Sequence, residues 1–421
     1  MRKLNYLDLF AGAGGLSEGF MRAGVVPIAH VEMDLAACFT LKTRLAFKWL
    51  EKHNQKEIYY SYLNGDITRD ELYSRIPRRL LDSVLNYEIS EDTIQEIFSS
   101  IDSLLEGEGI DLIVGGPPCQ AYSIIGRARD KKNMEGDKRN YLYRLYALFL
   151  EKYKPKYFVF ENVLGILSAK DVDGKFHFEK MRDLFRKKGY STEYQIVNSA
   201  DFGVLQNRKR VILIGKYGEQ ENFYPKLQPI ENTYKVAEIF KDLPRIQAGE
   251  GTFSLVKTTD YEGEYLFLSK IKEKNGEPTT FHIARPQTIR DKEIYGIAVR
   301  MWNEEHKRLS YVDLPSQLQT QKNRKSFLDR FKVVAGDLDK SQTIVAHISK
   351  DGHYFIHPDI AQNRSLTPRE AARLQTFPDN YYFESVSGKP SRTAAYRQIG
   401  NAVPVCLAET IALALLEVWD E

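Results

Sequence analysis

The stretch DLFAGAGGLSEGF, residues 8–20, joins an expected strand to an expected helix through a glycine turn. The strand covers the apolar run that ends at Phe10. Gly12, Gly14 and Gly15 follow, where the backbone must turn tightly and approach a ligand. Alone, this pattern also fits a plain strand-to-helix turn. The sequence that follows decides between a ligand-binding turn and a plain turn, because it repeats the alternation of strand and helix.

Short apolar runs alternate with amphipathic stretches as far as Lys216. The runs expected as strands include KLNYLDLF (3–10), VPIAHVEM (26–33), DLIVGG (111–116), KYFVFENV (156–163), TEYQIVNSADFG (192–203) and RVILIGK (210–216). The stretches between them have the spacing of helices. This rhythm predicts an α/β fold, a Rossmann-like, mostly parallel sheet with helices on both faces. Ligands of such sheets bind at the carboxyl ends of the strands.

Two regions depart from the rhythm. Residues 70–109 include the acidic segment YEISEDTIQEIFSSIDSLLEGEG and are expected to form a surface insertion between two strands. Residues 220–363 contain many Lys and Arg with scattered Tyr and Phe, and they predict a second lobe of irregular short strands. The chain then ends in AVPVCLAETIALALLEVW (402–419), an apolar helix that should be buried.

The composition is that of a globular protein, with 43% hydrophobic and 28% charged residues in 421. No window approaches the ~18 uninterrupted apolar residues of a membrane helix, and Asp8 stands where a signal peptide would be apolar. We therefore expect a cytoplasmic protein with no membrane partner. The net charge of +3 is too small to prove a polyanionic partner. The three cysteines are far apart, which indicates neither a disulfide framework nor a zinc site.

Two carboxylates follow the glycine turn. Glu32 ends the second expected strand in VEMD, and Asp66 is expected to end a third strand in NGDI. A carboxylate after the second strand suits a ribose diol, and one after the third can accept a hydrogen bond from an adenine amino group. The turn lacks the lysine of a phosphate-binding loop. The pattern therefore favours S-adenosylmethionine, a nucleoside without a phosphate chain, over ATP or NAD.

Cys119 stands on a stiff loop, because Pro117 and Pro118 fix two φ angles directly before it. Cys38 and Cys406 lie among apolar helix neighbours and are expected to pack as small apolar side chains rather than to react. A thiol of pKa ~8.5 is a few per cent ionised at pH 7, so complete ionisation gains only roughly tenfold. Enzymes typically need roughly 10⁶-fold or more. If Cys119 is a nucleophile, its substrate must be activated as well.

Candidates for that activation lie further along the chain. Glu161 ends the apolar strand FVFENV, where a buried carboxylate would be costly. Gln206, Arg208 and Arg210 alternate in QNRKR and would share one face of an extended segment. Two guanidiniums on one face suit an anionic or carbonyl-rich ligand. Taken alone, QNRKR fits a solvated charge run equally well, and Glu161 fits an ordinary acid at the end of a strand.

Six motifs together resemble the DNA (cytosine-5) methyltransferase family of the bacterial restriction-modification type. They are Phe10-Ala11-Gly12-x-Gly14-Gly15, Gly116-Pro117-Pro118-Cys119-Gln120, Glu161-Asn162-Val163, Gln206-x-Arg208-x-Arg210, RSLTPREAARLQTFPDNY (364–381) and YRQIGNAVP (396–404). They stand in the family's order. The resemblance implies a catalytic and cofactor-binding domain over residues 1–219, completed by 384–421. Residues 220–383 would form a smaller, irregular target-recognition domain.

The resemblance also implies a reaction, in which a methyl group passes from S-adenosylmethionine to carbon 5 of cytosine. Cys119 would attack carbon 6, and Glu161 would hold ring nitrogen 3 and the 4-amino group. Arg210 would bind the ring carbonyl, with Arg208 supporting the cysteine side. By the same matching, the cofactor pocket would be lined by Phe10, Gly12, Gly14, Leu16, Glu32, Met33, Asp66, Leu142 and Asn401. The transfer needs no metal, so His347, His353 and His357 are expected to support the second lobe or contact DNA.

Double-stranded DNA is the expected partner, and a cognate restriction endonuclease that acts separately would accompany it. Carbon 6 is out of reach inside a duplex, so the target base must be flipped out. The basic loop GRARDKKNMEGDKR (126–139) would close over the phosphates as a lid, although by sequence alone a solvated loop is favoured.

Two alternatives stay open. A tRNA cytosine-5 methyltransferase would share the catalytic lobe, but the long, basic and aromatic second region favours DNA. A catalytically silent DNA-binding regulator would share the fold, but the intact set of Cys119, Glu161 and Arg210 argues against it.

Overall fold

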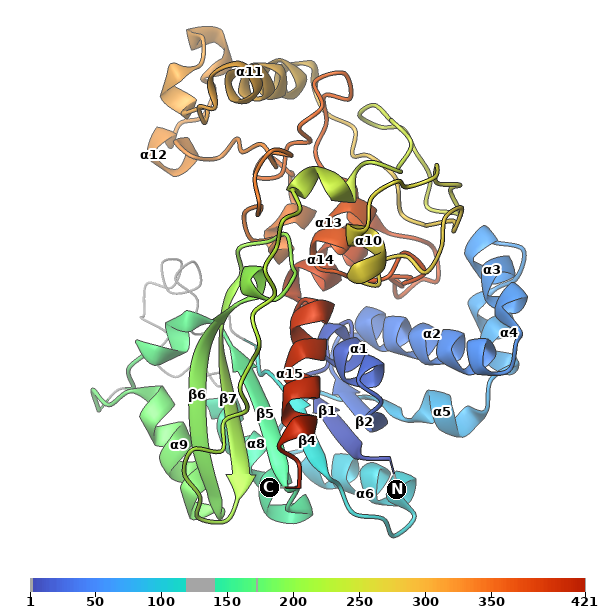
Figure 1. Cartoon of the computed structure of the whole chain (residues 1–421), viewed down its shortest axis with the longest axis vertical. Coiled ribbons are helices and arrows are strands. Elements are labelled where there is room, and N and C mark those ends of the chain that lie inside the picture. Colours follow the sequence, from blue (N-terminus) through green and yellow to red (C-terminus); the bar gives the residue numbers. More distant parts are fainter. Residues whose placement is uncertain (1–2, 119–140, 172, 421) are drawn as a thin grey trace.

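The structure, a computed structural model, describes residues 3–118, 141–171 and 173–420. Within these residues seven strands form one sheet in the order β3-β2-β1-β4-β5-β7-β6 (Figure 1). The strands are β1 Asn5–Leu9, β2 Val26–Glu32, β3 Val84–Asn86, β4 Leu112–Gly115, β5 Tyr157–Asn162, β6 Tyr190–Asn198 and β7 Lys209–Tyr217. Neighbours from β3 to β5 are parallel, and β7 is antiparallel to β5 and β6. The predicted mostly parallel sheet is confirmed.

Helices cover both faces of the sheet, because successive side chains of a strand point to opposite sides. On one face, Tyr6 and Val114 pack with α1 and α15. On the other face, Leu7 and Ile113 pack with α6, α8 and α9. These helices are α1 Gly15–Arg22, α6 Ile94–Leu105, α8 Leu142–Tyr153, α9 His177–Lys187 and α15 Val405–Glu417. The predicted two helix layers are confirmed.

The third strand lies elsewhere than predicted. The residues before Asp66 form α3 (Lys56–Asn64), which follows α2 (Leu35–Lys52). Gly65 ends α3 in the left-handed conformation, at φ 87°. Glycine commonly ends helices in this way, and Tyr59, Tyr62 and Leu63 are buried at helical spacing. The prediction of a strand that ends at Asp66 is therefore wrong.

The segment expected as a surface insertion is part of the framework instead. Residues 70–109 contain α5 (Arg78–Asp82), β3 and α6, with most of α4 (Arg69–Ser74). β3 has only three residues and lies at the edge of the sheet, beside β2. So short a strand carries too few alternations to be recognised from its sequence.

The second lobe is irregular as predicted, but it is built from short helices rather than strands. In the described part of residues 220–363, strand pairing is limited to isolated bridges. Its helices are η5 Val236–Ile239, α10 Tyr265–Leu268, α11 Ile289–Glu305, η6 Tyr311–Asp313, η7 Ser316–Leu318, α12 Arg324–Phe327 and η8 Ala346–Ser349. The segment from α11 to Phe331 has a small core of its own, which includes Tyr295 and Tyr311.

A larger cluster joins the rest of this lobe to the sheet domain. It includes Phe47 of α2 and Tyr59 of α3, together with Phe281 of the lobe. It also includes side chains of α13 (Pro368–Leu374) and α14 (Arg392–Asn401). The cluster thus contains side chains from both predicted domains, the catalytic domain and the target-recognition domain, whose borders were predicted at 219 and 383.

α13 brings buried charges into this cluster. Arg364 makes a bidentate ion pair with Glu370, at 2.7 and 2.8 Å, and Arg373 lies between Asp242 and Asp379. Both guanidiniums are at most 1% exposed. Burial of a charge is tolerated only when it is paired and hydrogen-bonded, as here. The motif around α13 therefore has a structural role in this protein.

The apolar end of the chain is buried, as predicted. Arg392–Glu417 is long and apolar enough to cross a membrane by length and composition alone, but 72% of its apolar window is buried inside the protein. α15 packs on α1 against the sheet, close enough that a Cβ at Gly19 would lie 2.4 Å from that of Ala408 (Figure 1). This stretch is a core element of the fold.

Candidate active site

The loop that leads to Cys119 leaves β4 in close contact with its two neighbouring strands. A Cβ at Gly115 would lie 2.1 Å from the carbonyl oxygen of Leu9, and one at Gly116 would lie 2.5 Å from that of Glu161. Neither distance is possible for a real Cβ, so both positions require glycine. Cys119 itself and the predicted lid at residues 126–139 lie outside the described residues.

Asn162 ties this loop to the end of β5. Its Nδ2 donates to the carbonyl oxygen of Pro117 at 3.2 Å, and its Oδ1 accepts from the backbone N–H of Val163 at 2.9 Å. The side chain is 1% exposed, so losing either bond would leave a buried polar group unsatisfied. Asn162 therefore positions the loop two residues before Cys119. Sequence reasoning gave it no role, although an amide after an apolar strand was a usable signal.

Glu161 and Arg210 meet at the same end of the sheet. Arg210 Nε lies 2.6 Å from Glu161 Oε1, and the two side chains are 13% and 15% exposed. The antiparallel pairing of β5 with β7 brings them together, since Glu161 pairs with Ile212. A Cβ at Gly116 would lie 2.7 Å from Glu161 Oε2, which places this carboxylate against the loop that leads to Cys119. The predicted proximity of the two residues is confirmed.

Arg208 lies on the same buried face of QNRKR as Arg210, but its hydrogen-bond partners are different. The side chains of Gln206, Arg208 and Arg210 point inward, and the residues between them are exposed, as the alternation predicts. Arg208 is 1% exposed and donates to the carbonyl oxygens of Ile344 at 2.7 Å and Gly400 at 3.4 Å. It thereby joins the sheet domain to the segment just before η8 and to α14. Whether it also supports Cys119 stays a prediction.

Glu32 holds the glycine turn at the ends of β1 and β2. Its Oε2 accepts from the backbone N–H of Gly12, and its Oε1 accepts from that of Asp34, both at 2.8 Å. Burial raises the pKa of Glu32, and the two N–H donors act in the opposite direction. Gly12 has φ +54°, and no heavy atom lies within 4 Å of a Cβ placed on it. Among the described residues, the turn therefore has open space beside Gly12.

Asp8 is a second buried carboxyl at this edge, and sequence reasoning missed it. It is 1% exposed, and neither carboxyl oxygen has a hydrogen-bond partner within the described chain. Burial raises its pKa well above the ordinary value, and the nearby Glu32 carboxylate adds to the shift. An unpaired buried carboxyl is costly, and a cationic ligand would relieve that cost. The signal in the sequence was an acid inside an otherwise apolar strand.

The other cofactor candidates of the glycine turn lie close to this edge. Phe10 has φ 58°, a left-handed conformation that is strained for a residue with a side chain. Gly14 has φ 78°, and a Cβ there would lie 2.9 Å from the hydroxyl of Tyr381. Leu16 is buried between α1 and the sheet, whereas Met33 is 58% exposed.

The remaining candidates come from separate elements. Leu142 begins α8, and Asn401 ends α14 with an exposed side chain. Asp66 is exposed after α3, and its carboxylate accepts from Asn64 Nδ2 at 3.1 Å. In the described structure no contact joins Asp66 to Glu32 or Gly12. The strand-end argument for assigning Asp66 to the cofactor is therefore lost, and its assignment by resemblance to the family stays a prediction.

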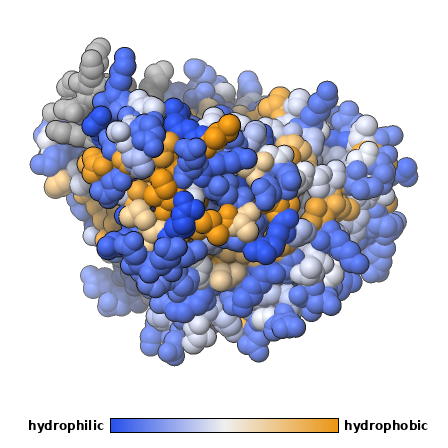
Figure 2. All heavy atoms as spheres, turned by 90° about the horizontal axis from the view of Figure 1, so that it is seen from above, coloured by the Kyte–Doolittle hydropathy of each residue, from blue (hydrophilic) through white to orange (hydrophobic). Residues whose placement is uncertain are grey.

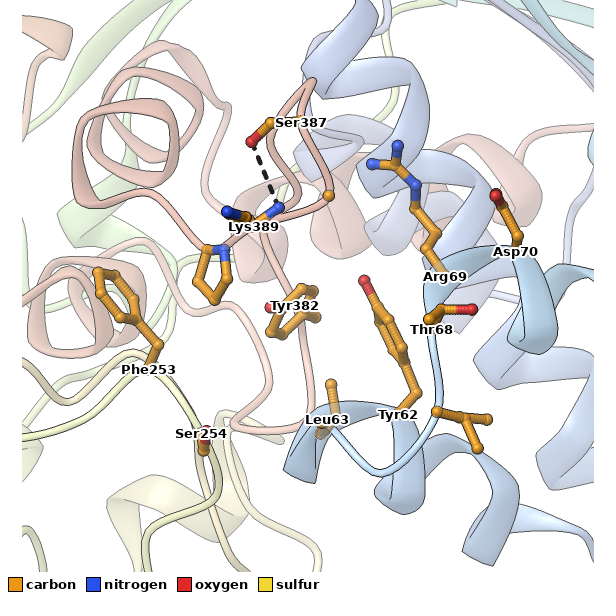
Figure 3. Close-up of a pocket in the computed structure, with 14 residues that line it drawn as sticks. Tyr62, Leu63, Thr68, Arg69, Asp70, Phe253, Ser254, Tyr382, Ser387 and Lys389 are labelled. Carbon is orange, nitrogen blue, oxygen red and sulfur yellow. Dashed lines mark hydrogen bonds between the residues drawn. The ribbon is translucent and has the colours of Figure 1, made fainter.

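A pocket of about 370 Å³ lies beside this Asp66 segment. Figure 3 shows Tyr62 and Tyr382 facing each other across it, with Arg69 and Lys389 at its edge. Its lining is Tyr62, Leu63, Gly65, Ile67, Thr68, Arg69, Asp70, Phe253, Ser254, Tyr382, Ser387, Gly388, Lys389 and Pro390. None of the predicted site residues contributes to it, so it is separate from the candidate active site.

Two of the three histidines considered in the sequence, His353 and His357, pack within the second lobe. His357 is buried and meets Phe240 edge to face with the ring centres 4.6 Å apart, and burial lowers its pKa to about 4. His353 shares a hydrogen bond with the hydroxyl of Tyr295 at 2.9 Å. Among the described residues, no three metal-binding side chains come together.

The chain is similar to known proteins along nearly its whole length. The family model of C-5 cytosine-specific DNA methylases matches residues 4–70 and 83–417. The type II methyltransferase M.Bpa9945I of Bacillus paralicheniformis is 40% identical, over 98% of this chain and 98% of its own length. The type II methyltransferase M.DdeI of Desulfomicrobium norvegicum is 31% identical, over 97% of this chain and 88% of its own.

Solved structures share the fold. A putative DNA modification methyltransferase encoded within a prophage (E. coli) aligns over the whole of both chains, with a TM-score of 0.62 and 23% identity. The Dnmt2 methyltransferase of S. pombe aligns over 99% of both chains, with a TM-score of 0.52 and 17% identity. The family model and the relative at 40% identity each cover nearly the whole chain. The protein therefore belongs to the C-5 cytosine-specific DNA methylase family and is a DNA (cytosine-5-)-methyltransferase.

Proposed function

We propose that the protein methylates one cytosine within a specific double-stranded DNA sequence, through a covalent Cys119 adduct on a flipped-out base and with S-adenosylmethionine as methyl donor. The observation that carries this proposal is the Glu161–Arg210 ion pair beside Gly116, at the start of the loop that leads to Cys119. Thiolate, carboxylate and guanidinium are the three groups that the reaction needs around one pyrimidine ring.

Each group has a separate task. Cys119 attacks carbon 6, which makes carbon 5 nucleophilic. Glu161 holds ring nitrogen 3 and the 4-amino group, and Arg210 donates to the ring carbonyl, so that charge developing on the ring is stabilised. When bound, S-adenosylmethionine supplies the methyl group to carbon 5. A base then removes the carbon 5 proton, and the thiol leaves.

Replacing Glu161 with glutamine is expected to lower kcat by about 10²- to 10³-fold, because thiolate attack places negative charge on the ring, and an amide cannot hold the neutralising proton on ring nitrogen 3 as the carboxylate does. Single-turnover transfer of labelled methyl groups measures the effect. The control is Glu179→Gln on the outer side of α9, where the carboxylate is 60% exposed and pairs only with Arg182. Equal rates for the two variants would refute the role of Glu161.

The ends of β1 and β2 fit S-adenosylmethionine. Glu32 Oε1 and Oε2 each accept one backbone N–H, which leaves lone pairs for a ribose diol. The unpaired carboxyl of Asp8 suits the positive charges of a sulfonium and an ammonium group. Gly12 leaves space beside the turn. We propose that Phe10, Gly14, Leu16, Met33, Leu142 and Asn401 complete the pocket.

Cofactor affinity is expected to rise with pH. Burial raises the pKa of Asp8 and Glu32 in the free protein, and a bound cation would favour their ionised forms. Between the lower pKa values of the complex and the raised values of the free protein, binding releases protons, so affinity falls as pH is lowered. Calorimetry across this range measures the slope, which Asp8→Asn should reduce. S-adenosylhomocysteine, which lacks the sulfonium charge, should show a shallower slope, and equal slopes would contradict the assignment.

The second lobe carries basic side chains that fit a DNA backbone. Lys322 and Arg324 are exposed, and in the described part of the chain neither has a carboxylate within ion-pair distance. By contrast, Lys307 of the same lobe pairs with Glu305 at 2.8 Å. Figure 1 shows α12 above the ends of β6 and β7, and Figure 2 shows a mostly hydrophilic surface on this side. We propose that residues 220–383 recognise the target and that the loop at 126–139 closes over the DNA.

Replacing both Lys322 and Arg324 with alanine is expected to weaken DNA binding and to lower the slope of log K against log salt by about 2, roughly one unit for each lost phosphate contact. Fluorescence anisotropy with a labelled duplex at several salt concentrations measures the slope. The matched control is Lys307→Ala, whose ammonium already has a partner. A slope unchanged from the wild type would show that neither side chain contacts phosphate.

Labelled methyl transfer to duplex DNA and to tRNA tests the proposed substrate. DNA labelling is expected, and labelling of tRNA alone would favour the tRNA enzyme instead. Bisulfite sequencing of DNA from cells that express the protein would give the recognition sequence.

Two relatives are named type II methyltransferases, which supports a restriction-modification role in the cytoplasm beside a separate endonuclease. Methylated DNA should then resist cleavage by that endonuclease.

A further inference from the structure

The hydroxyl of Tyr381 contacts the glycine turn between β1 and α1. It donates a hydrogen bond of 2.6 Å to the backbone carbonyl oxygen of Ala13, which lies 368 residues earlier in the chain. Both residues are at most 2% exposed, so the bond is shielded from solvent. Burial raises the pKa of Tyr381 well above its ordinary value, so the hydroxyl keeps its proton and remains a donor. A residue of the predicted target-recognition domain thus touches the turn proposed to hold the cofactor.

The peptide group between Ala13 and Gly14 is held at both of its polar atoms. Its oxygen accepts from Tyr381, and its N–H, that of Gly14, donates to the carbonyl oxygen of Ala11 at 3.0 Å. Gly14 has φ 78° and can take other backbone conformations at little cost, because it has no Cβ. Without the Tyr381 hydroxyl, the buried oxygen of Ala13 would lose its partner in the described chain, and rotation of this peptide would relieve that cost. The hydroxyl therefore selects one conformation of the turn.

The same turn contains the open space proposed for the cofactor. No described heavy atom lies within 4 Å of a Cβ placed on Gly12, and the Gly12 N–H donates to Glu32 Oε2 at 2.8 Å. A Cβ at Gly14, in contrast, would lie 2.9 Å from the hydroxyl oxygen of Tyr381. The turn is thus closely packed at Gly14 and open at Gly12. Ala13 lies between these two glycines, so a rotation there would change the shape of the open part.

Tyr381 is itself held by buried arginines. Arg369 of α13 donates to the carbonyl oxygen of Tyr381 at 2.7 Å and to that of Pro378 at 3.0 Å. The guanidinium of Arg44, on α2, lies 4.9 Å from the centre of the Tyr381 ring and makes a bidentate ion pair with Glu18 of α1, at 2.5 and 2.8 Å. Both guanidiniums are at most 3% exposed. The Tyr381 hydroxyl is therefore a fixed point against which the turn rests.

We infer that Tyr381 is a positioning residue for the cofactor, because its hydroxyl holds the glycine turn in the conformation that binds S-adenosylmethionine. The inference rests on the proposed use of this cofactor at the turn. Tyr381 acts through the backbone of Ala13. It should therefore change the affinity for the cofactor and leave the methyl transfer step itself unchanged.

Calorimetry on the full chain with S-adenosylhomocysteine tests this in Tyr381→Phe, which removes the hydroxyl and keeps the ring. The dissociation constant is expected to rise about tenfold, the scale of one buried hydrogen bond. In steady-state methyl transfer, the KM for S-adenosylmethionine should rise by a similar factor, whereas kcat at saturating cofactor should stay near the wild-type value.

The matched control is Tyr190→Phe at the start of β6. Tyr190 is as buried as Tyr381, and its hydroxyl also donates to a backbone carbonyl oxygen, that of Pro155 at 2.9 Å. Pro155 precedes β5 and so lies at the amino ends of the parallel strands, away from the glycine turn at their carboxyl ends. This variant should lose similar stability in urea unfolding, but it should bind S-adenosylhomocysteine as the wild type does.

Equal weakening of binding in both variants would overturn the inference, because it would indicate a general loosening of the fold. A lower kcat with an unchanged KM in Tyr381→Phe would also contradict it. Failure of the wild type to bind S-adenosylhomocysteine would contradict the proposed cofactor and the inference with it. Binding by the wild type that Tyr381→Phe leaves unchanged would contradict the role of Tyr381 alone. The two failures are therefore distinguishable in one set of titrations.

Discussion

Replacing Cys119 with serine is expected to abolish methyl transfer, by on the order of 10⁴-fold or more, as for other enzymes that lose their nucleophile. A thiol reaches its nucleophilic anion at neutral pH far more readily than a hydroxyl does. The same variant should fail to trap a duplex that carries 5-fluorocytosine at the target. In the wild type this base should give a stable adduct, because fluorine cannot leave as the proton does. Denaturing electrophoresis of the protein–DNA product measures the trap.

The control is Cys406→Ser. Cys406 lies at the first turn of α15, where its Sγ is 3.4 Å from the carbonyl oxygen of Ser269 and burial raises its pKa. A thiol that burial keeps neutral is a poor nucleophile, so the adduct should form undiminished in this variant. Binding of S-adenosylhomocysteine by both variants would show that they are folded. An adduct with Cys119→Ser at wild-type yield would refute the nucleophile.

Much of the fold follows from local patterns in the sequence. β1, β2, β4, β5 and β7 each coincide with an apolar run bounded by polar or glycine residues, and β6 overlaps the strand expected at 192–203. The apolar runs are long enough to be recognised in the sequence. β3 is too short for this, and the residues before Asp66 carry aromatic side chains that suit a strand as well as a helix. The error in the third strand thus arose because the local preference of these residues for a strand is weak. Tertiary packing overrode that preference and formed a helix.

The residues of the candidate site could be predicted where they lie at the ends of strands. Glu161 and Glu32 end parallel strands, so their carboxylates come to one edge of the sheet whatever the helices do. Arg208 was not predictable in the same way, because its carbonyl partners at Ile344 and Gly400 come from segments with no pairing pattern in the sequence. Asn162 and Asp8 stand out in the sequence as polar residues at or in apolar strands, but only the packed structure shows what their side chains contact or lack.

Replacing Arg373 with methionine is expected to lower the free energy of unfolding by about 3–5 kcal/mol, the usual cost of breaking a buried ion pair. The guanidinium is fully buried and contacts Asp242 at 2.6 Å and Asp379 at 2.5 Å, with both carboxylates at most 2% exposed. Methionine fills similar space, but it leaves Asp379 without its partner and Asp242 with Lys272 alone. Urea unfolding of the full chain measures the loss.

The surface pair of Arg245 and Asp359 is the matched control, because Arg245 is 72% exposed and Arg245→Met should cost about 1 kcal/mol or less. Adding Asp379→Asn to Arg373→Met should recover part of the loss, since a neutral amide tolerates burial better than an unpaired carboxylate.

The pH dependence separates lost charge from lost packing. Burial alone would raise the pKa of Asp242, but the Arg373 guanidinium, with the Lys272 ammonium, outweighs it and holds that pKa below its ordinary value. Such a carboxylate stabilises the fold above its unfolded pKa, and the contribution is lost as pH falls through the lowered folded pKa. The loss caused by Arg373→Met should therefore shrink in acid. A loss that is equal at neutral and acidic pH would mean that α13 needs the volume of this side chain and not its charge.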